Sequence, residues 1–182
     1  MTKTQYHTIV AGTDGSDLSA PTIKRAAWLA AREDADLVIV CAYTELSARA
    51  EAKNVATMGG DARGGKVLGR DTASAALASA VMAASDEGAT IAAALLVDGE
   101  PDAALLQIAE DRGAQLIVLG AIHDRTLVDR LLGTVAEEVT KRAQCDVLIV
   151  RPPSATGAAV TAEELVAAET EASGPEDVEE TV

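Results

Sequence analysis

Five short runs of aliphatic residues constrain the fold of this chain more than any other feature. They occupy residues 7–14, 35–43, 89–97, 114–120 and 145–150, and each is nearly continuous rather than alternating with polar residues. Such runs are typical of parallel strands that are covered on both faces. The run ATIAAALLV (89–97) gives the weakest signal, because its alanines suit a helix equally well.

Helical patterns fill the intervals between these runs, over 19–33, 71–87, 100–113 and 133–144. The alternation of strands and helices predicts an α/β fold, a five-stranded parallel sheet that is doubly wound with right-handed crossovers. If the first three strands extend in one direction and the last two in the other, the strand order is 3-2-1-4-5. The first and fourth strands are then neighbours at a switch point.

The helix ends carry recognisable signals. Thr72 or Ser74 is expected to cap the second helix, and Thr134 is expected to cap the fourth. Pro101 fits the first turn of the third helix and Gly113 its end.

Composition excludes several classes of partner. The net charge is -14, which disfavours nucleic acid and anionic membrane surfaces. No apolar run approaches the 18 residues of a membrane span. The N-terminus lacks the apolar stretch of a signal peptide. The two cysteines, Cys41 and Cys145, lie in or beside aliphatic runs and are expected to be small buried hydrophobes of a reduced, cytoplasmic protein.

The sequence predicts one domain over 1–151, followed by an acidic tail over 152–182. The tail holds eight acids and no base, and too few large apolar residues to build a core. We expect it to be mostly disordered. A capping box formed by Thr161 and Glu164 favours a short helix as the alternative.

Residues 44–70 break the rhythm of strands and helices. The stretch nearly matches a phosphate-binding P-loop at Gly60, Gly65 and Lys66, but Val67 stands where a magnesium-binding Ser or Thr is required. No strand directly precedes it. A long functional or mobile loop is therefore the preferred interpretation.

Catalytic and metal-binding signals are sparse. His7 and His123 are the two histidines, and no metal-binding or nucleophilic motif occurs. His7 is expected to be an ordinary polar residue at the start of the first strand. We therefore predict neither a catalytic residue nor a metal site.

Two stretches follow predicted strands at the same edge of the sheet, GTDGS (12–16) and GAIHDRTLVDRLLGT (120–134). In a doubly wound sheet, ligands bind outside the carboxyl ends of the strands at the switch point. Asp14 would then face Gly120 across a crevice, and the helix beginning at Thr134 would direct free N–H groups into it. An acid opposite such amides suits a ribose hydroxyl and a phosphate.

The spacing of Gly120, two residues, His123, nine residues and Gly133-Thr134 resembles the signature of the universal stress proteins. GTDGS after the first strand and the ending CDVLIVRP also resemble that family, over residues 7–151. The resemblance implies the adenine-nucleotide alpha hydrolase-like fold. It also implies a homodimer through the last strand, Asp146 to Val150.

In nucleotide-binding members of the family, the aspartate after the first strand and a second-strand residue approach ribose and adenine. The loop glycines and the Gly-Ser/Thr pair hold phosphates. The resemblance therefore implies ATP (with Mg) or cyclic AMP as ligand, although some members bind no nucleotide. The candidate contacts are Gly12, Thr13, Asp14, Ala42, Gly120, His123, Arg125, Gly133, Thr134 and Val135.

His123 stands where the family has its second glycine, and three outcomes remain open. The ring blocks ATP, points harmlessly away, or contacts a phosphate together with Arg125. The leading hypothesis is a non-catalytic, nucleotide-responsive stress protein. The alternative is an interaction protein without nucleotide, acting through its dimer surface, long loop or tail.

Overall fold

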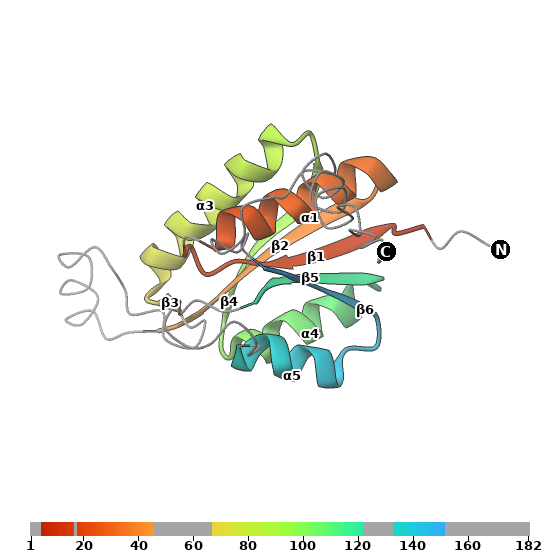
Figure 1. Ribbon diagram of the computed structural model, residues 1–182. Coiled ribbons are helices and arrows are strands. Elements are labelled where there is room, and N and C mark those ends of the chain that lie inside the picture. Colours follow the sequence, from red (N-terminus) through yellow and green to blue (C-terminus); the bar gives the residue numbers. More distant parts are fainter. Residues whose placement is uncertain (1–4, 17, 46–66, 122–132, 152–182) are drawn as a thin grey trace, which may run out of the picture. The chain divides into compact units, whose positions relative to one another are not determined.

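The computed structural model describes residues 5–16, 18–45, 67–121 and 133–151 (Figure 1). All of them lie in the first of two units into which the chain divides, Met1–Pro152 and Pro153–Val182. In chain order the elements are β1 (Thr8–Gly12), α1 (Ser19–Glu33), β2 (Asp36–Thr44), β3 (Val67–Leu68), α3 (Arg70–Asp86), β4 (Thr90–Asp98), α4 (Pro101–Asp111), β5 (Leu116–Gly120), α5 (Thr134–Arg142) and β6 (Asp146–Val150).

The strands form one parallel sheet. β2 pairs with β1 and β4, β1 pairs with β5, and β5 pairs with β6. The five long strands therefore lie in the order β4-β2-β1-β5-β6, which confirms the predicted order. ATIAAALLV forms most of strand β4, so its alanines adopt the extended conformation here.

The short strand β3 was not predicted, and it corrects the interpretation of 44–70 as one loop. Val67 pairs with Tyr43, and α3 begins only two residues after the short strand ends. The carbonyl of Val40 accepts a hydrogen bond from Thr13, the residue after β1, and the carbonyl of Thr44 accepts one from Gly69. Since carbonyls four residues apart point to the same edge of a strand, β3 continues the edge that β1 occupies.

The expectation that all five strands are buried is wrong for β4 and β6, whose two faces are only partly covered. Residues of β1, β2 and β5 are mostly buried, whereas those of β4 and β6 are half-buried or exposed. Both lie at the ends of the sheet, where each pairs with a strand on one side within the described residues. A continuous aliphatic run does not distinguish a central strand from an edge strand.

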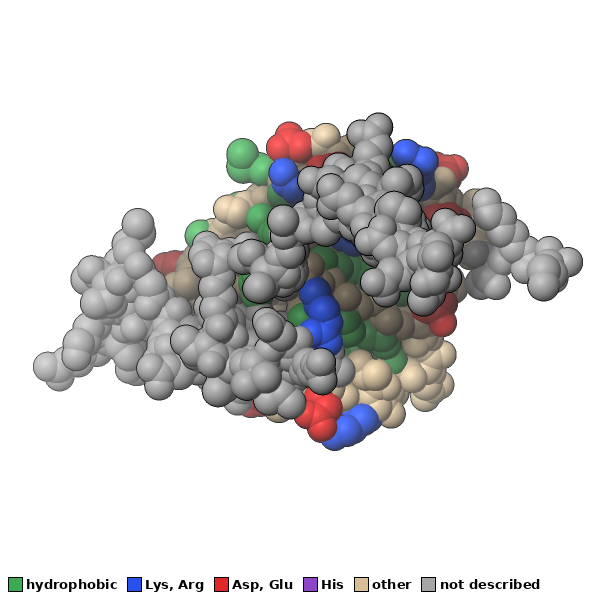
Figure 2. Space-filling model, in the orientation of Figure 1, with side chains coloured by type: hydrophobic (Ala, Val, Ile, Leu, Met, Phe, Trp, Pro, Cys, Tyr) green, Lys and Arg blue, Asp and Glu red, His purple; other side chains and the backbone are tan. Residues whose placement is uncertain are grey.

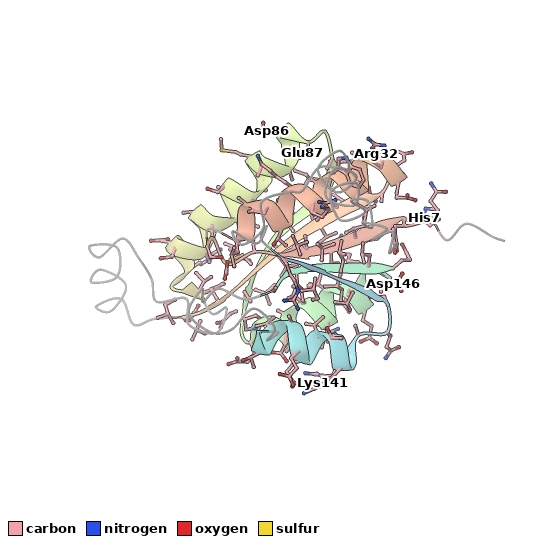
Figure 3. All side chains as sticks on the ribbon, in the orientation of Figure 1. His7, Arg32, Asp86, Glu87, Lys141 and Asp146 are labelled. Atoms are coloured by element: carbon pink, nitrogen blue, oxygen red, sulfur yellow. The ribbon has the colours of Figure 1, made fainter. Side chains whose placement is uncertain are left out.

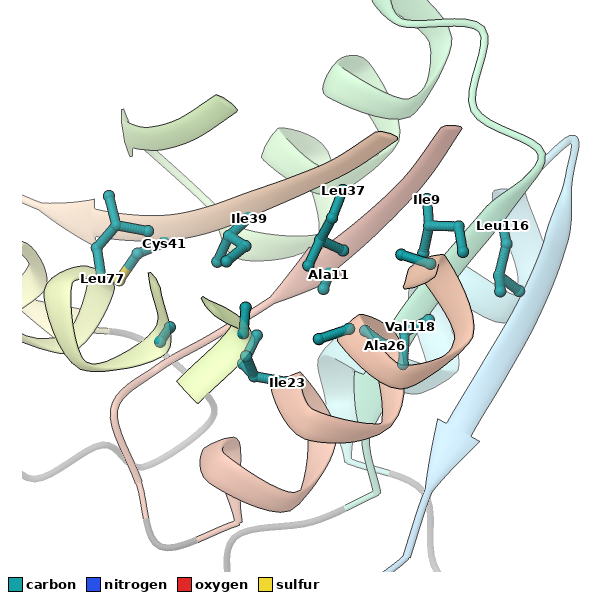
Figure 4. Close-up of a cluster of buried hydrophobic side chains, with 14 of the residues drawn as sticks. Ile9, Ala11, Ile23, Ala26, Leu37, Ile39, Cys41, Leu77, Leu116 and Val118 are labelled. Atoms are coloured by element: carbon teal, nitrogen blue, oxygen red, sulfur yellow. The ribbon is translucent and has the colours of Figure 1, made fainter. Parts of the chain in front are cut away.

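Helices cover both faces of the sheet, with α1 and α3 on one face and α4 and α5 on the other (Figure 1). On the first face, Ile23 and Ala26 of α1 pack over Ile9, Ala11 and other strand residues (Figure 4). Many of the buried helix residues there are alanines, which lets the helices approach the sheet closely. The burial supplies the main driving force for folding of a chain with few aromatics.

Two predicted helix caps are wrong. The N-cap of α3 is Gly69, so Thr72 and Ser74 lie inside the helix, and the N-cap of α5 is Gly133 rather than Thr134. Neither glycine has a side chain that could provide a cap. The predicted limits of α4 are confirmed more closely, with Pro101 as its first residue and Gly113 at a positive φ of 56° beyond its end.

Both cysteines are free thiols packed among apolar residues, as predicted. Cys41 is fully buried in β2, and Cys145 is partly buried. Burial, with a smaller effect from the Asp14 carboxylate, raises the pKa of the Cys41 thiol to about 12. A search of the described residues finds no helix long and apolar enough to cross a membrane.

Candidate functional site

The carboxyl ends of β1 and β5 lie side by side at the centre of the sheet. The two strands pair in parallel through Ala11 and Val118, and they end at Gly12 and Gly120. The chain runs from β1 outward in one direction and returns at β5 to extend in the other. This is the switch point at which doubly wound sheets bind ligands, and it is where the sequence predicted a crevice.

Both strand-ending glycines have a packing role of their own. A Cβ atom on Gly12 would lie 2.9 Å from Cδ2 of Leu119 and 3.3 Å from both methyl groups of Leu105. A Cβ atom on Gly120 would lie 3.1 Å from the hydroxyl of Thr22. The absence of side chains therefore lets α4 and α1 pack closely at the two strand ends, whether or not a ligand is bound.

The turn after β1 places Asp14 at this edge through local hydrogen bonds. The Oδ1 atom of Asp14 accepts bonds from the backbone N–H of Ser16 (2.9 Å) and the hydroxyl of Ser19 (2.7 Å). Thr13 is buried, and its backbone N–H donates to the carbonyl of Val40 at 2.9 Å. The turn is thus tied to β2 and holds the carboxylate in a defined orientation.

Ser19, which the sequence analysis missed, connects most of the groups in this turn. Its Oγ atom lies 3.1 Å from the backbone nitrogens of Asp14 and Gly15 and 3.1 Å from the Thr13 hydroxyl. Ser19 opens α1, and a serine at the start of a helix after an Asp-Gly-Ser turn was the available signal.

Helix α3 lies against the far side of the same turn. Gly15 has a φ of 74°, and a Cβ atom there would lie 2.7 Å from the Cβ atom of Ala76. A small cavity of about 90 Å³ beside the turn is lined by Thr13, Ser16 and Ser19 together with α1 and α3 residues. No local sequence pattern could reveal this contact, because the two segments are about sixty residues apart in the chain.

The start of α5 contributes backbone groups to the same edge. The N–H of Gly133 donates to the carbonyl of Ala121 at 2.8 Å, which ties the helix start to the end of β5. The first bond inside the helix is from Glu137 to the Gly133 carbonyl at 2.9 Å. Within the described part of the chain, the N–H groups of residues 134–136 have no acceptor. Thr134 is exposed and Val135 packs on the α4/α5 side.

Ala42 lies in β2, two residues beyond the partner of Gly12. It is 6% exposed and shares a sheet face with Val38 and Val40. Among the described residues, Ala42 forms no hydrogen bond with the β1–α1 turn or with α5. His123 and Arg125, and the P-loop-like residues before Val67, lie outside the described residues.

His7 lies away from this edge, and the described residues offer no cluster of metal ligands. His7 precedes β1 at the amino-terminal edge of the sheet, as predicted, and is exposed there (Figure 3). No group of three or more acidic, histidine or cysteine side chains that could hold a metal occurs in the ranges that the structure describes.

The chain belongs to the universal stress protein family, whose model matches residues 5–151. The universal stress protein Rv1636 of Mycobacterium tuberculosis is 37% identical over 145 residues, which are 80% of this chain and 96% of that protein. The universal stress protein MJ0531 of Methanocaldococcus jannaschii is 32% identical over 153 residues, 81% of this chain and 84% of that protein.

A crystal structure of a universal stress protein in complex with cAMP has the same fold. It superposes with a TM-score of 0.59 at 34% identity and covers 81% of this chain and 98% of that chain. The predicted family and fold class are therefore confirmed. The individual site residues stay predictions.

Proposed function

We propose that this protein binds an adenine nucleotide at the carboxyl edge of its sheet and acts as a non-catalytic, nucleotide-responsive stress protein. The observation that carries the proposal is the meeting of three features at the switch point. They are the held Asp14 carboxylate, the side-chain-free end of β5 and the three N–H groups at the start of α5. The similar protein whose crystal structure contains cAMP supports the same ligand class.

The three features suit different parts of a nucleotide. A carboxylate accepts hydrogen bonds from ribose hydroxyls, and free N–H groups at a helix start attract phosphate. In the proposed complex, Gly12, Thr13, Asp14 and Ala42 surround the nucleoside. The remaining candidates, Gly120, His123, Arg125, Gly133, Thr134 and Val135, lie toward the phosphates. ATP with Mg and cyclic AMP are both candidate ligands.

Calorimetric titration of the full-length protein with Mg-ATP, ADP, AMP and cyclic AMP tests this proposal. We expect at least one nucleotide to bind, and Asp14→Asn to weaken its binding at least tenfold, because a hydrogen bond to a charged group is worth about 1.5–3 kcal/mol. Asp36→Asn is the matched control, since Asp36 is exposed at the amino-terminal edge of the sheet. Absence of binding with all four nucleotides would favour the alternative, an interaction protein that binds no nucleotide.

His123→Gly tests the residue that departs from the family signature. If the imidazole obstructs the triphosphate, the substitution strengthens ATP binding. If the imidazole contacts a phosphate, the substitution weakens binding at least tenfold, and wild-type binding tightens as the pH falls toward about 6.5, where histidine gains its proton. His123→Ala controls for protonation of the phosphates. We expect obstruction of ATP, with a smaller phosphate ligand still accepted. Equal affinities would mean that the side chain points at solvent.

We further propose a homodimer in which two copies of β6 pair with each other. Val147 to Val150 are half-buried aliphatic residues at an edge of the sheet. Asp146 and Val150 direct backbone bonds toward β5 and Ala121, so alternation places the N–H groups of Val147 and Ile149 on the outer edge.

Light scattering of wild type and Val147→Pro tests the dimer. Proline at Val147 removes an outward N–H without removing a bond to β5, so we expect a folded monomer from the variant and a dimer from wild type. A monomeric wild type would contradict the proposal.

The domain boundary and the location of the protein are also proposals. The division of the chain between Pro152 and Pro153 and the two free thiols support a stress protein domain over 1–151 and a cytoplasmic location. We expect deletion of residues 154–182 to leave the melting temperature within a few degrees, because their composition offers almost no large apolar side chains.

A further inference from the structure

The outward face of α1 carries an unusual group of side chains for so acidic a protein. Lys24, Arg25, Trp28 and Arg32 are exposed on it, while Ile23, Ala26, Ala27 and Ala30 face the core on the opposite side of the helix. We call these four exposed residues the α1 basic face. At 1.5 Å per residue, the face extends about 12 Å along the helix.

The basic side chains of this face have no acidic partners among the residues that the structure describes. Within the described ranges, no ion pair joins an acid to Lys24, Arg25 or Arg32. Glu33 and Asp34 follow at the end of the helix, and Figure 2 shows acidic side chains close to basic ones on this side of the molecule. The face itself nevertheless carries three positive charges.

Trp28 is the only tryptophan of the chain, and it is 42% exposed. The Arg25 guanidinium lies 5.6 Å and the Arg32 guanidinium 4.9 Å from the centre of its ring. Figure 3 shows Arg32 on the outer side of the helix near its end. Stacking on one ring orients both guanidiniums before any partner arrives, which lowers the entropy cost of binding.

We propose that the α1 basic face binds a short acidic segment of a partner protein. Trp and Arg are the residue types that contribute most to protein interfaces, and the unpaired positive charge complements carboxylates. Nucleic acid fits less well, because an extended polyanion would be repelled by the net charge of -14. This surface is separate from the nucleotide site, so the inference does not depend on the proposed function.

The probe for this proposal is a fluorescein-labelled acidic peptide, acetyl-EELEELEE-amide, and its binding is measured by anisotropy with the full-length protein. We expect binding that weakens as the salt concentration rises from about 0.01 to 0.15 M, which shortens the Debye length from about 30 to 8 Å. Quenching of Trp28, the sole tryptophan, would locate the peptide at α1. The peptide acetyl-QQLQQLQQ-amide is the uncharged control and is expected not to bind.

Two charge-reversal double variants distinguish the effect of the α1 basic face on peptide binding from the effect of the net charge. Arg25→Glu combined with Arg32→Glu is expected to weaken peptide binding at least tenfold. Arg70→Glu combined with Arg112→Glu changes the net charge equally at two exposed residues elsewhere and is expected to leave binding within about twofold. Circular dichroism confirms that both variants are folded.

The remaining outcomes would overturn the proposal. Absence of peptide binding, or an equal loss in both double variants, would mean that the face has no specific role. Tighter binding of a single-stranded RNA or of anionic vesicles would assign the face to those partners instead. Peptide binding at least tenfold tighter in a full-length chain with its eight tail acids changed to Gln would identify the chain's own tail, rather than a partner protein, as the occupant of this face.

Discussion

The β1–α1 turn and the start of α5 both lie at the carboxyl edge of the sheet, and they are built from different groups. The β1–α1 turn is held by side chains, because Ser19, Asp14 and Thr13 bond to one another and to nearby backbone. The start of α5 uses backbone alone within the described residues, and its N-cap is a glycine. One side of the candidate site is therefore fixed by its side chains, whereas the other offers backbone donors, which only a substitution by proline removes.

The largest expected loss of stability distinguishes Gly15 in the β1–α1 turn from Gly133 at the start of α5. Gly15→Ala places a Cβ atom at a φ of 74° and 2.7 Å from the Cβ atom of Ala76. Left-handed strain and overpacking together predict a loss of about 2–5 kcal/mol in the free energy of unfolding, measured with urea. Gly133→Ala, at an ordinary φ of -64°, is expected to cost less than about 1 kcal/mol.

A double variant separates the two causes. Ala76→Gly removes the atom that a Cβ on residue 15 would strike, so Gly15→Ala with Ala76→Gly is expected to retain only the backbone strain. Ala76→Gly alone supplies the baseline for a helical glycine, about 1 kcal/mol. If Gly15→Ala were no more costly than Gly133→Ala, the β1–α1 turn would not be pressed against α3 as described.

The second prediction removes the hydroxyl that organises the first turn. Ser19→Ala removes the hydroxyl that donates to the Asp14 carboxylate and accepts from the backbone N–H groups of Asp14 and Gly15, and a loss of about 1–3 kcal/mol is expected. The same variant is expected to weaken nucleotide binding, because the carboxylate loses its fixed orientation. Ser19→Thr keeps the hydroxyl and is expected to retain more of both. Wild-type stability and nucleotide affinity in Ser19→Ala would show that the Ser19 hydroxyl does not hold the turn together.

The third prediction concerns the thiol near this turn. The pKa of Cys41 rises from its ordinary value near 9 to about 12, chiefly because the thiol is buried. The unfolded thiol loses its proton at lower pH, so stability is intact below about pH 9 and falls by ~1.4 kcal/mol per pH unit toward 12. Urea unfolding at pH 8 and pH 10 measures the loss, and Cys41→Ala subtracts other titrating groups. An identical pH slope in Cys41→Ala would contradict the raised pKa.

The smallest expected change in stability follows from removing the hydroxyl of Thr134 at the start of α5. Thr134 is exposed and forms no side-chain hydrogen bond within the described residues, so Thr134→Ala is expected to change stability by less than about 0.5 kcal/mol. A true N-cap threonine would cost about 1 kcal/mol or more. Urea unfolding of Ser19→Ala and Thr134→Ala therefore compares the β1–α1 turn with the start of α5. A loss of about 1 kcal/mol or more in Thr134→Ala would show that Thr134 caps the helix after all.

The arrangement of the sheet was accessible from the sequence because burial leaves a periodic record. The aliphatic runs identified all five long strands, and their order along the chain implied that β1 and β5 are neighbours. The same record does not distinguish an edge from a centre, so the half-buried state of β4 and β6 was missed. The two residues of β3 are too few to form a pattern at all.

The site was predictable only where local chemistry implied it. Asp14 and the start of α5 follow from strand ends and a helix signal, although glycines took the N-cap positions that Thr72, Ser74 and Thr134 were expected to fill. The connection of Ser19 to Thr13 and Asp14 depends on how the turn folds back on itself. The contact between Gly15 and Ala76 depends on long-range packing, which no single segment records.

The short strand β3 has a consequence for how this chain can be lengthened. Val67 pairs with Tyr43, and Gly69 donates to the carbonyl of Thr44 at 3.0 Å. The described residues on either side of 46–66 therefore lie at adjacent points of the sheet. Doubling the length of a flexible loop whose ends are held together costs only about 0.6 kcal/mol in loop-closure entropy. We therefore expect that the sheet keeps its strand register, and the β1–α1 turn its hydrogen bonds, when a guest domain or an affinity tag is inserted between Glu45 and Lys66.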